Sequence, residues 1–183
     1  MKVVQFFLVN LCLILPVSVF SAESAYQLNE GDTLKISVWG EETLNHEINV
    51  LPDGSISFPL VGSVNVNSMT APQVAEEIKK RIKTFIPDPH VSVVISSTAG
   101  NRVYVLGKVN NPGAVAMHGP MSVIQVLSIS GGLGKFADED KIRVIRYKEG
   151  KQQQLKINYG AIMSGSDLST NHQLMAGDTI LVP

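Results

Sequence analysis

Apolar and polar residues alternate over several short segments of this chain, which is the pattern of half-buried strands. The first covers 34–38, where Leu34, Ile36 and Val38 alternate with polar residues. Similar runs follow at 48–58, 63–68, 90–96, 103–109, 141–147, 153–158 and 177–183. The pattern therefore predicts a chain rich in short strands.

Two segments have helical spacing instead. Each begins with a Ser/Thr-x-x-Gln capping box, in which the side chains of the first and fourth residues satisfy free backbone groups. The segment 71–85 carries one apolar stripe, made by Val74, Ile78, Ile82 and Phe85. The segment 123–130 is apolar nearly all round, which predicts a buried helix.

Glycine and proline mark the corners between these elements. Asp53-Gly54 predicts a two-residue hairpin turn that joins the apolar runs on either side. The segment 111–114, Asn-Pro-Gly-Ala, fits a type II turn, because proline fixes φ and glycine supplies positive φ. Helices and strands together predict an α+β fold of two small mixed modules, 25–99 and 100–183.

A nearly identical phrase occurs twice, as "YQLNEGDTL" at 26–34 and "HQLMAGDTI" at 172–180. Glycine can take an unusual φ, and aspartate can bond its own backbone before a strand begins. We interpret the phrase as an architectural repeat that starts a strand at the edge of each sheet. Chance similarity between two turns is the alternative.

The N-terminus predicts a secretory signal peptide over 1–24, with cleavage between residues 21 and 24. Lys2 precedes an apolar run, and small residues fit cleavage before Ala22 or before Ala25. An uncleaved anchor is the alternative, but Asn10 and Pro16 interrupt the run. Cys12, the one cysteine, lies inside this run, so we expect no thiol in the mature protein and no lipoprotein.

Charge and motifs predict no catalytic chemistry. Lys and Arg number 15 against 16 Asp and Glu, so no basic excess points to nucleic acid. The four histidines are widely separated, whereas metal ligation needs clustered donors. The "SGGLGK" segment follows a helix rather than a strand, unlike a phosphate loop. We therefore expect no enzyme, no catalytic residues, no metal and no cofactor.

The corner residues carry a resemblance to a family. "VLPDGSISFPLVGSVNV", the 70–85 segment and "PDPHVSVVI" resemble the polysaccharide biosynthesis/export domain of outer-membrane polysaccharide export proteins. "RVYVLGKVNNPGAV", "VIQVLSISGGL" and "GDTILVP" resemble the soluble-ligand-binding β-grasp (SLBB) domain that follows it. The resemblance rests on the structural residues Pro52, Asp53, Gly54, Pro59, Gly62, Asp88, Pro89, Gly107, Pro112, Gly113, Gly131, Gly132, Gly177 and Asp178.

The resemblance implies a function outside the cytoplasm. Members of the family assemble into rings, octameric in several cases, that carry capsular or extracellular polysaccharide across the periplasm and outer membrane. The implied partners are further copies, the polysaccharide, and an inner-membrane copolymerase that often carries a tyrosine kinase. The implied location is the periplasm, in association with the outer membrane.

Two departures from the family pattern shape the expectation. The chain has no lipobox, and it stops at Pro183 without the amphipathic helix that forms the pore in many members. We therefore expect a minimal periplasmic member that hands polymer to a separate outer-membrane barrel. Trp39, the sole tryptophan, is interpreted as core or interface packing rather than as a sugar-stacking residue.

A periplasmic small-ligand-binding or scaffold module is the competing hypothesis, because related β-grasp domains bind small ligands such as cobalamin. The N-terminal export pattern argues against it, since a pure ligand binder has no need of that half.

Overall fold

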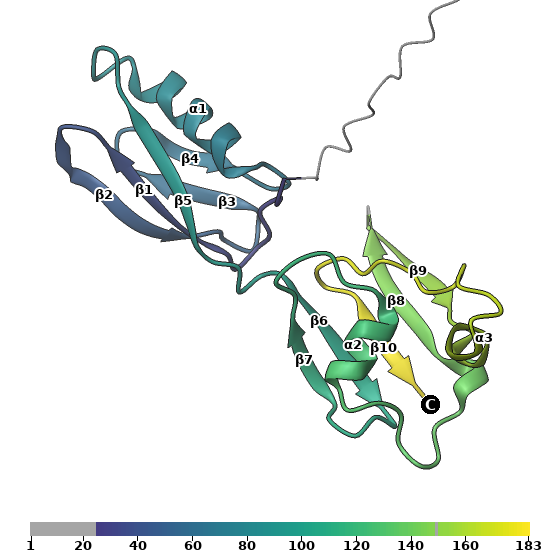
Figure 1. The fold of residues 1–183 in the computed structure, drawn as a ribbon. Helices are drawn as coiled ribbons and strands as arrows, with labels where there is room; N and C mark the ends of the chain where they lie inside the picture. Colours follow the sequence, from purple (N-terminus) through teal and green to yellow (C-terminus); the bar gives the residue numbers. More distant parts are fainter. Residues whose placement is uncertain (1–24, 149) are drawn as a thin grey trace, which may run out of the picture.

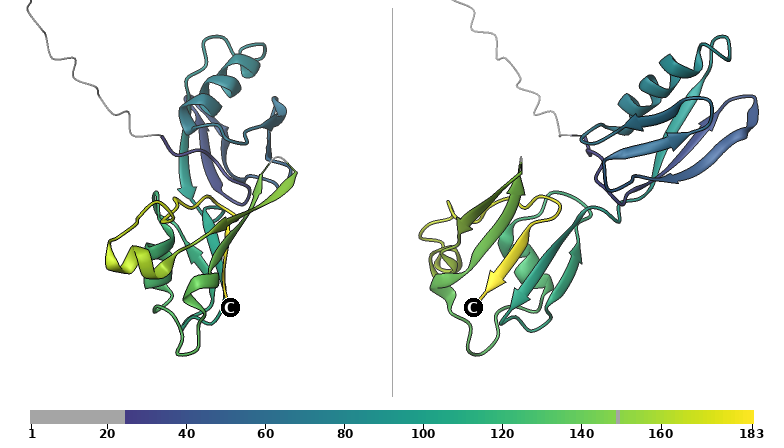
Figure 2. Two further views of the ribbon diagram at one scale, coloured as in Figure 1. Left: turned by 90° about the vertical axis from the view of Figure 1, so that its right-hand side faces the viewer. Right: turned by 180° about the vertical axis from the view of Figure 1, so that it is seen from behind.

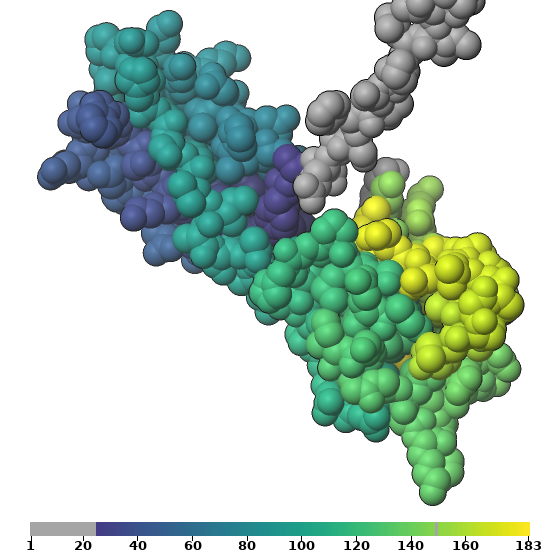
Figure 3. Space-filling view, in the orientation of Figure 1, coloured from purple at the N-terminus to yellow at the C-terminus, as the bar shows by residue number. Residues whose placement is uncertain are grey.

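The computed structural model describes residues 25–148 and 150–183, which fold into two modules of mixed helix and sheet (Figure 1). The space-filling view shows them as two lobes (Figure 3), and the ribbon shows the chain passing from one to the other between β5 and β6 (Figure 1). Each has its own buried apolar cluster, one formed by residues 28–82 and the other by residues 103–182. The α+β prediction is confirmed, whereas the predicted signal peptide lies outside the described residues.

The first module is built around strand β1 (Thr33–Val38). This strand lies at the centre of a three-stranded antiparallel sheet, between β2 (Glu41–Asn49) and β5 (Val91–Ser97). A separate hairpin is formed by β3 (Ser55–Phe58) and β4 (Gly62–Asn65). Helix α1 (Ala71–Ile82) packs along β5, and its apolar stripe joins the hairpin and the sheet in one core.

Helix α1 begins as its sequence predicts. The Thr70 backbone N–H donates to the Gln73 side chain at 2.8 Å, and the capping box is complete. Val74, Ile78 and Ile82 are fully buried. The prediction is wrong for Phe85, which is 58 % exposed, because the helix ends at Ile82 and the chain turns before reaching it.

The predicted hairpin at Asp53-Gly54 is also wrong. Strand β2 pairs with β1, and β3 pairs with β4, so the dipeptide redirects the chain from one sheet to the next. Gly54 alone has positive φ (+74°), whereas a type I′ hairpin turn needs positive φ at both central residues. The Asp53 carboxylate instead holds the turn by accepting the Ser55 N–H at 3.0 Å and the Ser55 hydroxyl at 2.7 Å. These hydrogen bonds lower the pKa of Asp53.

Gly54→Val should destabilise the first module by about 3 kcal/mol, since a β-branched residue resists positive φ. A Cβ there would also lie only 2.7 Å from the Cβ of Asn67. Gly62→Val is the matched control, because its φ is also +74° but its Cβ position is open. Thermal unfolding should show a smaller loss for Gly62→Val; equal losses would contradict the steric part of this account.

The second module contains a mixed five-stranded sheet in the order β7-β6-β10-β8-β9. Strand β10 lies in the middle, parallel to β6 and antiparallel to β8. The views in Figure 2 show helix α2 (Val123–Ile129) against one face of this sheet. The other elements are β6 (Arg102–Gly107), β7 (Gly113–Ala116), η1 (Glu139–Lys141), β8 (Arg143–Lys148), β9 (Lys151–Lys156), α3 (Tyr159–Ser164) and β10 (Thr179–Val182).

Helix α2 ends at a glycine pair, in agreement with the sequence. The Gly132 N–H donates to the Leu127 carbonyl and the Gly131 N–H to the Ser128 carbonyl, which is the Schellman pattern. Val123 and Leu127 face the core. The prediction that this helix is fully buried is wrong. One face of the helix packs on the sheet, but Ile129, on another face, is 57 % exposed.

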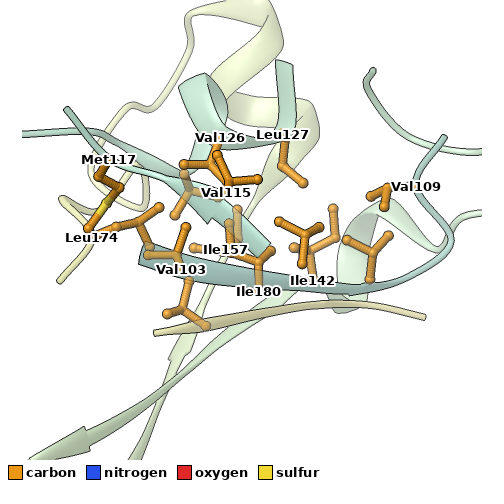
Figure 4. Close-up of a cluster of buried hydrophobic side chains, with 14 of the residues drawn as sticks. Val103, Val109, Val115, Met117, Val126, Leu127, Ile142, Ile157, Leu174 and Ile180 are labelled. Carbon is orange, nitrogen blue, oxygen red and sulfur yellow. The ribbon is translucent and has the colours of Figure 1, made fainter. Parts of the chain in front are cut away.

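The second core lies between α2 and the sheet (Figure 4). Val126 and Leu127 point from the helix toward Val103 and Ile180 on the central strands. The predicted type II turn before β7 is absent: Gly113 has φ +143°, far from the value near +80° that this turn needs, and already belongs to the strand.

Candidate functional site

The repeated phrase folds into the same turn twice. Gly31 and Gly177 have φ of +89° and +83°. In each turn the aspartate N–H donates at 3.1 Å to the carbonyl three residues earlier. The carboxylates of Asp32 and Asp178 each accept, at 2.9 Å, the N–H of that same earlier residue. Both aspartates are almost completely buried.

Each turn starts the central strand of its sheet, so the expectation of a sheet edge is wrong. The Gly31 N–H donates to the Val50 carbonyl, and the Val50 N–H donates to the Asp32 carbonyl. In the second module the Gly177 N–H donates to Arg102 and the Tyr104 N–H to Asp178. In each module one neighbour of the central strand, β2 in the first and β6 in the second, is thereby fixed where that strand begins.

Asp32 also connects the first module to the segment that leads into the second. Its Oδ1 accepts the Gly100 N–H at 2.9 Å, and its Oδ2 accepts the Tyr26 hydroxyl at 2.7 Å. Burial, with the hydrogen bond to Asp32, raises the pKa of Tyr26, so this hydroxyl stays a donor. A Cβ at Gly100 would collide with the Glu30 carbonyl, so only glycine allows this close approach.

Asp178 uses its remaining acceptor capacity for an ion pair. The Arg146 guanidinium donates through Nε at 2.9 Å and through Nη2 at 2.6 Å. Their side chains are 13 % and 1 % exposed, so the pair is largely desolvated. Hydrogen bonding to Asp178 raises the pKa of Arg146. The same Nη2 donates to the Gln173 carbonyl, so one arginine fixes both ends of the turn.

Trp39 lies at the surface, contrary to the predicted core position. Its side chain is 83 % exposed, so it is not a core residue. It lies in the short connection from β1 to β2, beside an open pocket lined by Glu41, Glu42 and Asn45. The Trp39 N–H donates to the His90 carbonyl in the loop before β5. An interface role for Trp39 stays a prediction.

The family-motif residues do not converge on one site. They lie in turns and at strand ends spread over both modules, whose elements Figure 1 labels. Pro52, Asp53 and Gly54 precede β3, Pro59 follows it and Gly62 begins β4; Asp88 and Pro89 precede β5; Gly107 ends β6, Pro112 precedes β7 and Gly113 begins it; Gly131 and Gly132 follow α2; Gly177 and Asp178 precede β10.

The described ranges, 25–148 and 150–183, hold no group of three or more metal-ligating side chains. Within the same ranges no helix is long and apolar enough to span a membrane. The second module has an open groove beside α2, lined by apolar residues that include Met121, Ile129, Tyr159 and Met163.

Comparisons with known proteins match both modules. Residues 21–96 match the model of the family "Polysaccharide biosynthesis/export protein", and residues 101–182 match the SLBB domain. The chain is 30 % identical over 172 residues to the EPS I polysaccharide export outer membrane protein EpsA of Ralstonia nicotianae. The aligned residues cover 93 % of this chain and 42 % of that protein.

Two further relatives have related names. The polysialic acid transport protein KpsD of Escherichia coli is 29 % identical over 162 residues, which is 86 % of this chain and 28 % of KpsD. The exopolysaccharide production protein ExoF of Rhizobium meliloti is 29 % identical over 119 residues, 59 % of this chain and 28 % of ExoF. The chain thus spans less than half the length of each. With both family models matched in the order that the sequence predicts, the chain belongs to the outer-membrane polysaccharide export family.

Proposed function

We propose that this protein acts in the export of capsular or extracellular polysaccharide, as a passive periplasmic conduit or adaptor built from several copies. One observation carries the proposal: an export module and an SLBB module follow each other in one chain. The match to the export protein EpsA extends over both modules and covers 93 % of this chain. The proposed partners are the polymer, an inner-membrane copolymerase and a separate outer-membrane barrel.

Self-association is the part of this proposal that the surface supports. Trp39 and Phe85 are 83 % and 58 % exposed; the first lies between β1 and β2, the second between α1 and β5. Figure 1 shows both connections at the end of the first module far from the second. Large exposed aromatic side chains are typical anchors of protein interfaces, because their burial contributes much of the binding energy. Contact between neighbouring copies would bury them.

Sedimentation of the mature chain, Ala25–Pro183, tests the oligomer. We expect assembly at micromolar concentration, and we expect Trp39→Ala to weaken it at least tenfold, since burial of an aromatic side chain contributes about 2 kcal/mol or more. Phe136→Ala is the control, because Phe136 is 76 % exposed but belongs to the second module. A strict monomer over this range would count against the conduit.

Export itself is tested in cells that lack the protein. We expect surface polysaccharide to fall sharply, intracellular and periplasmic polymer to rise, and the full chain to restore export. Normal surface polysaccharide in these cells would refute the proposed function.

The groove beside α2 keeps small-ligand binding as a second candidate. Its lining is apolar with a few polar groups, such as Gln125 and Ser128, which is a composition common in small-molecule sites. Equilibrium dialysis with cobalamin and with free sugars separates the candidates. Tight stoichiometric binding by a chain that stays monomeric would favour the second.

A further inference from the structure

The five-stranded sheet of the second module has one face that no helix covers within the described residues. Val103, Val144 and Ile180 point to the inner side, where α2 and α3 contribute to the same buried cluster. Because side chains alternate along a strand, the residues between them form an opposite face. Figure 2, seen from behind, shows the strands of this sheet in front of α2. We call this the outer face.

The outer face combines cations and amides with aliphatic and tyrosine side chains. Its exposed or half-exposed strand positions are Ala114, Ala116, Arg102, Tyr104, Leu106, Thr179, Leu181, Arg143, Ile145, Tyr147, Gln152, Gln154 and Lys156. Three of these are basic and none is acidic. Carboxylates at its rim include Asp140, which lines an open pocket with Arg143 and Lys156, and Glu30, which lines one with Arg102.

Two of the cations lie directly opposite each other. Arg143 on β8 and Lys156 on β9 are cross-strand partners, and like charges in that position destabilise a sheet. Among the described residues neither forms an ion pair. Lys141, in the same pocket, adds a third positive charge, although it is paired with Asp138 at 2.8 Å. An anionic ligand would relieve this repulsion.

Exposed tyrosines complete the face. Tyr104 on β6 is 45 % exposed and Tyr147 on β8 is 70 % exposed. They lie two strands apart, and Tyr147 is two residues beyond the position level with Tyr104, so their Cα atoms are about 12 Å apart by standard strand spacings. Gln152 pairs with Tyr147 and Gln154 with Ile145, which places amides beside the aromatic ring. Flat aromatic and amide surfaces suit an extended polymer rather than an enclosed small ligand.

We propose that the outer face binds an acidic polysaccharide, with Arg143 and Lys156 contacting its carboxylates, Gln152 and Gln154 its hydroxyls, and Tyr147 the faces of its sugar rings. The proposal rests on the proposed function and names the substrate class. Charge complementarity selects this occupant over a neutral glycan. Because the contacts are solvent-exposed, the binding should be weak and should fall as salt increases, which suits a chain that must slide.

Titration calorimetry of the mature chain with oligogalacturonate tests this, with fully methyl-esterified oligogalacturonate as the neutral polymer of the same backbone. We expect binding of the acidic form alone, weakened by sodium chloride. Arg143→Gln combined with Lys156→Gln should lower affinity about tenfold. Lys80→Gln combined with Lys83→Gln on the first module removes the same charge elsewhere and should change affinity less than twofold.

Tyr147→Ala is a second variant that leaves every charge in place, and it should lower affinity several-fold if the ring contacts sugar. Equal weakening by the Lys80 and Lys83 control, or equal binding of both polymers, would overturn the proposal. If the outer-face variants bind the acidic polymer as the unaltered chain does but sediment differently, the face is a contact between copies, and the proposal is also overturned. Normal export in cells lacking the protein refutes the proposed function, whereas the calorimetry decides the binding face.

Discussion

Gly107→Ala should destabilise the second module by at least about 3 kcal/mol and lower its melting temperature by more than about 10 °C. Gly107 has φ +104° at the end of β6, where it lies level with Val182 in the parallel pair with β10. A Cβ would collide with the Val182 carbonyl, which also accepts the Lys108 N–H at 2.8 Å. The main chains of two central strands would have to separate. Thermal unfolding followed by circular dichroism measures the effect.

Gly119→Ala is the control for this prediction. Gly119 lies in the same module, has ordinary φ, and has no atom within 4 Å of the position that a Cβ would occupy. We expect a change within about 0.5 kcal/mol. Similar melting temperatures for the two variants would show that the close contact between β6 and β10 is misplaced.

Asp178→Ala should also destabilise the second module, by about 3–5 kcal/mol. The change removes the acceptor for the Met175 N–H and for two donor groups of Arg146. An arginine that is 13 % exposed would be left without its partner, and breaking one side of a buried ion pair costs this much. Chemical denaturation of the purified variant measures the loss.

Arg146→Met separates the ion pair from the turn. The Asp178 carboxylate would still accept the Met175 N–H, so this variant should lose less stability than Asp178→Ala. In the double variant the losses should not add, because the two residues share one network. Additive losses would mean that Arg146 and Asp178 act independently.

The local patterns predicted the elements better than their pairing. Strands β1, β8 and β10 follow the alternation of their sequences, and both helices begin at their capping boxes. The position of β10 between β6 and β8 could not be predicted, because no local pattern specifies which distant strand becomes a neighbour. The wrong hairpin at Asp53-Gly54 has the same origin, since the pairing partners of β2 and β3 lie elsewhere.

The exposed position of Trp39 could have been predicted from the alternation of side chains along β1. Val38 is buried and Trp39 follows it, so strict alternation places the indole on the outward side. The expectation of a core or interface position weighted residue type over position, and its core half is wrong. The role of Arg146, by contrast, could not be predicted from the sequence. It lies in β8 among alternating apolar and polar residues, and no local pattern indicates that Asp178, far along the chain, is its partner.

The middle place of β10 has a consequence for how the molecule is made. Strands β6 to β9 all precede β10 in the chain, yet β6 and β8 cannot be joined until residues 179–182 arrive between them. The first module has no such delay, because β1, its central strand, is made before its sheet neighbours. The sheet of the first module can therefore form before the second module is complete. Until β10 is in place, the edges of β6 and β8 stay unpaired, and a chaperone or a strand of another protein can bind there.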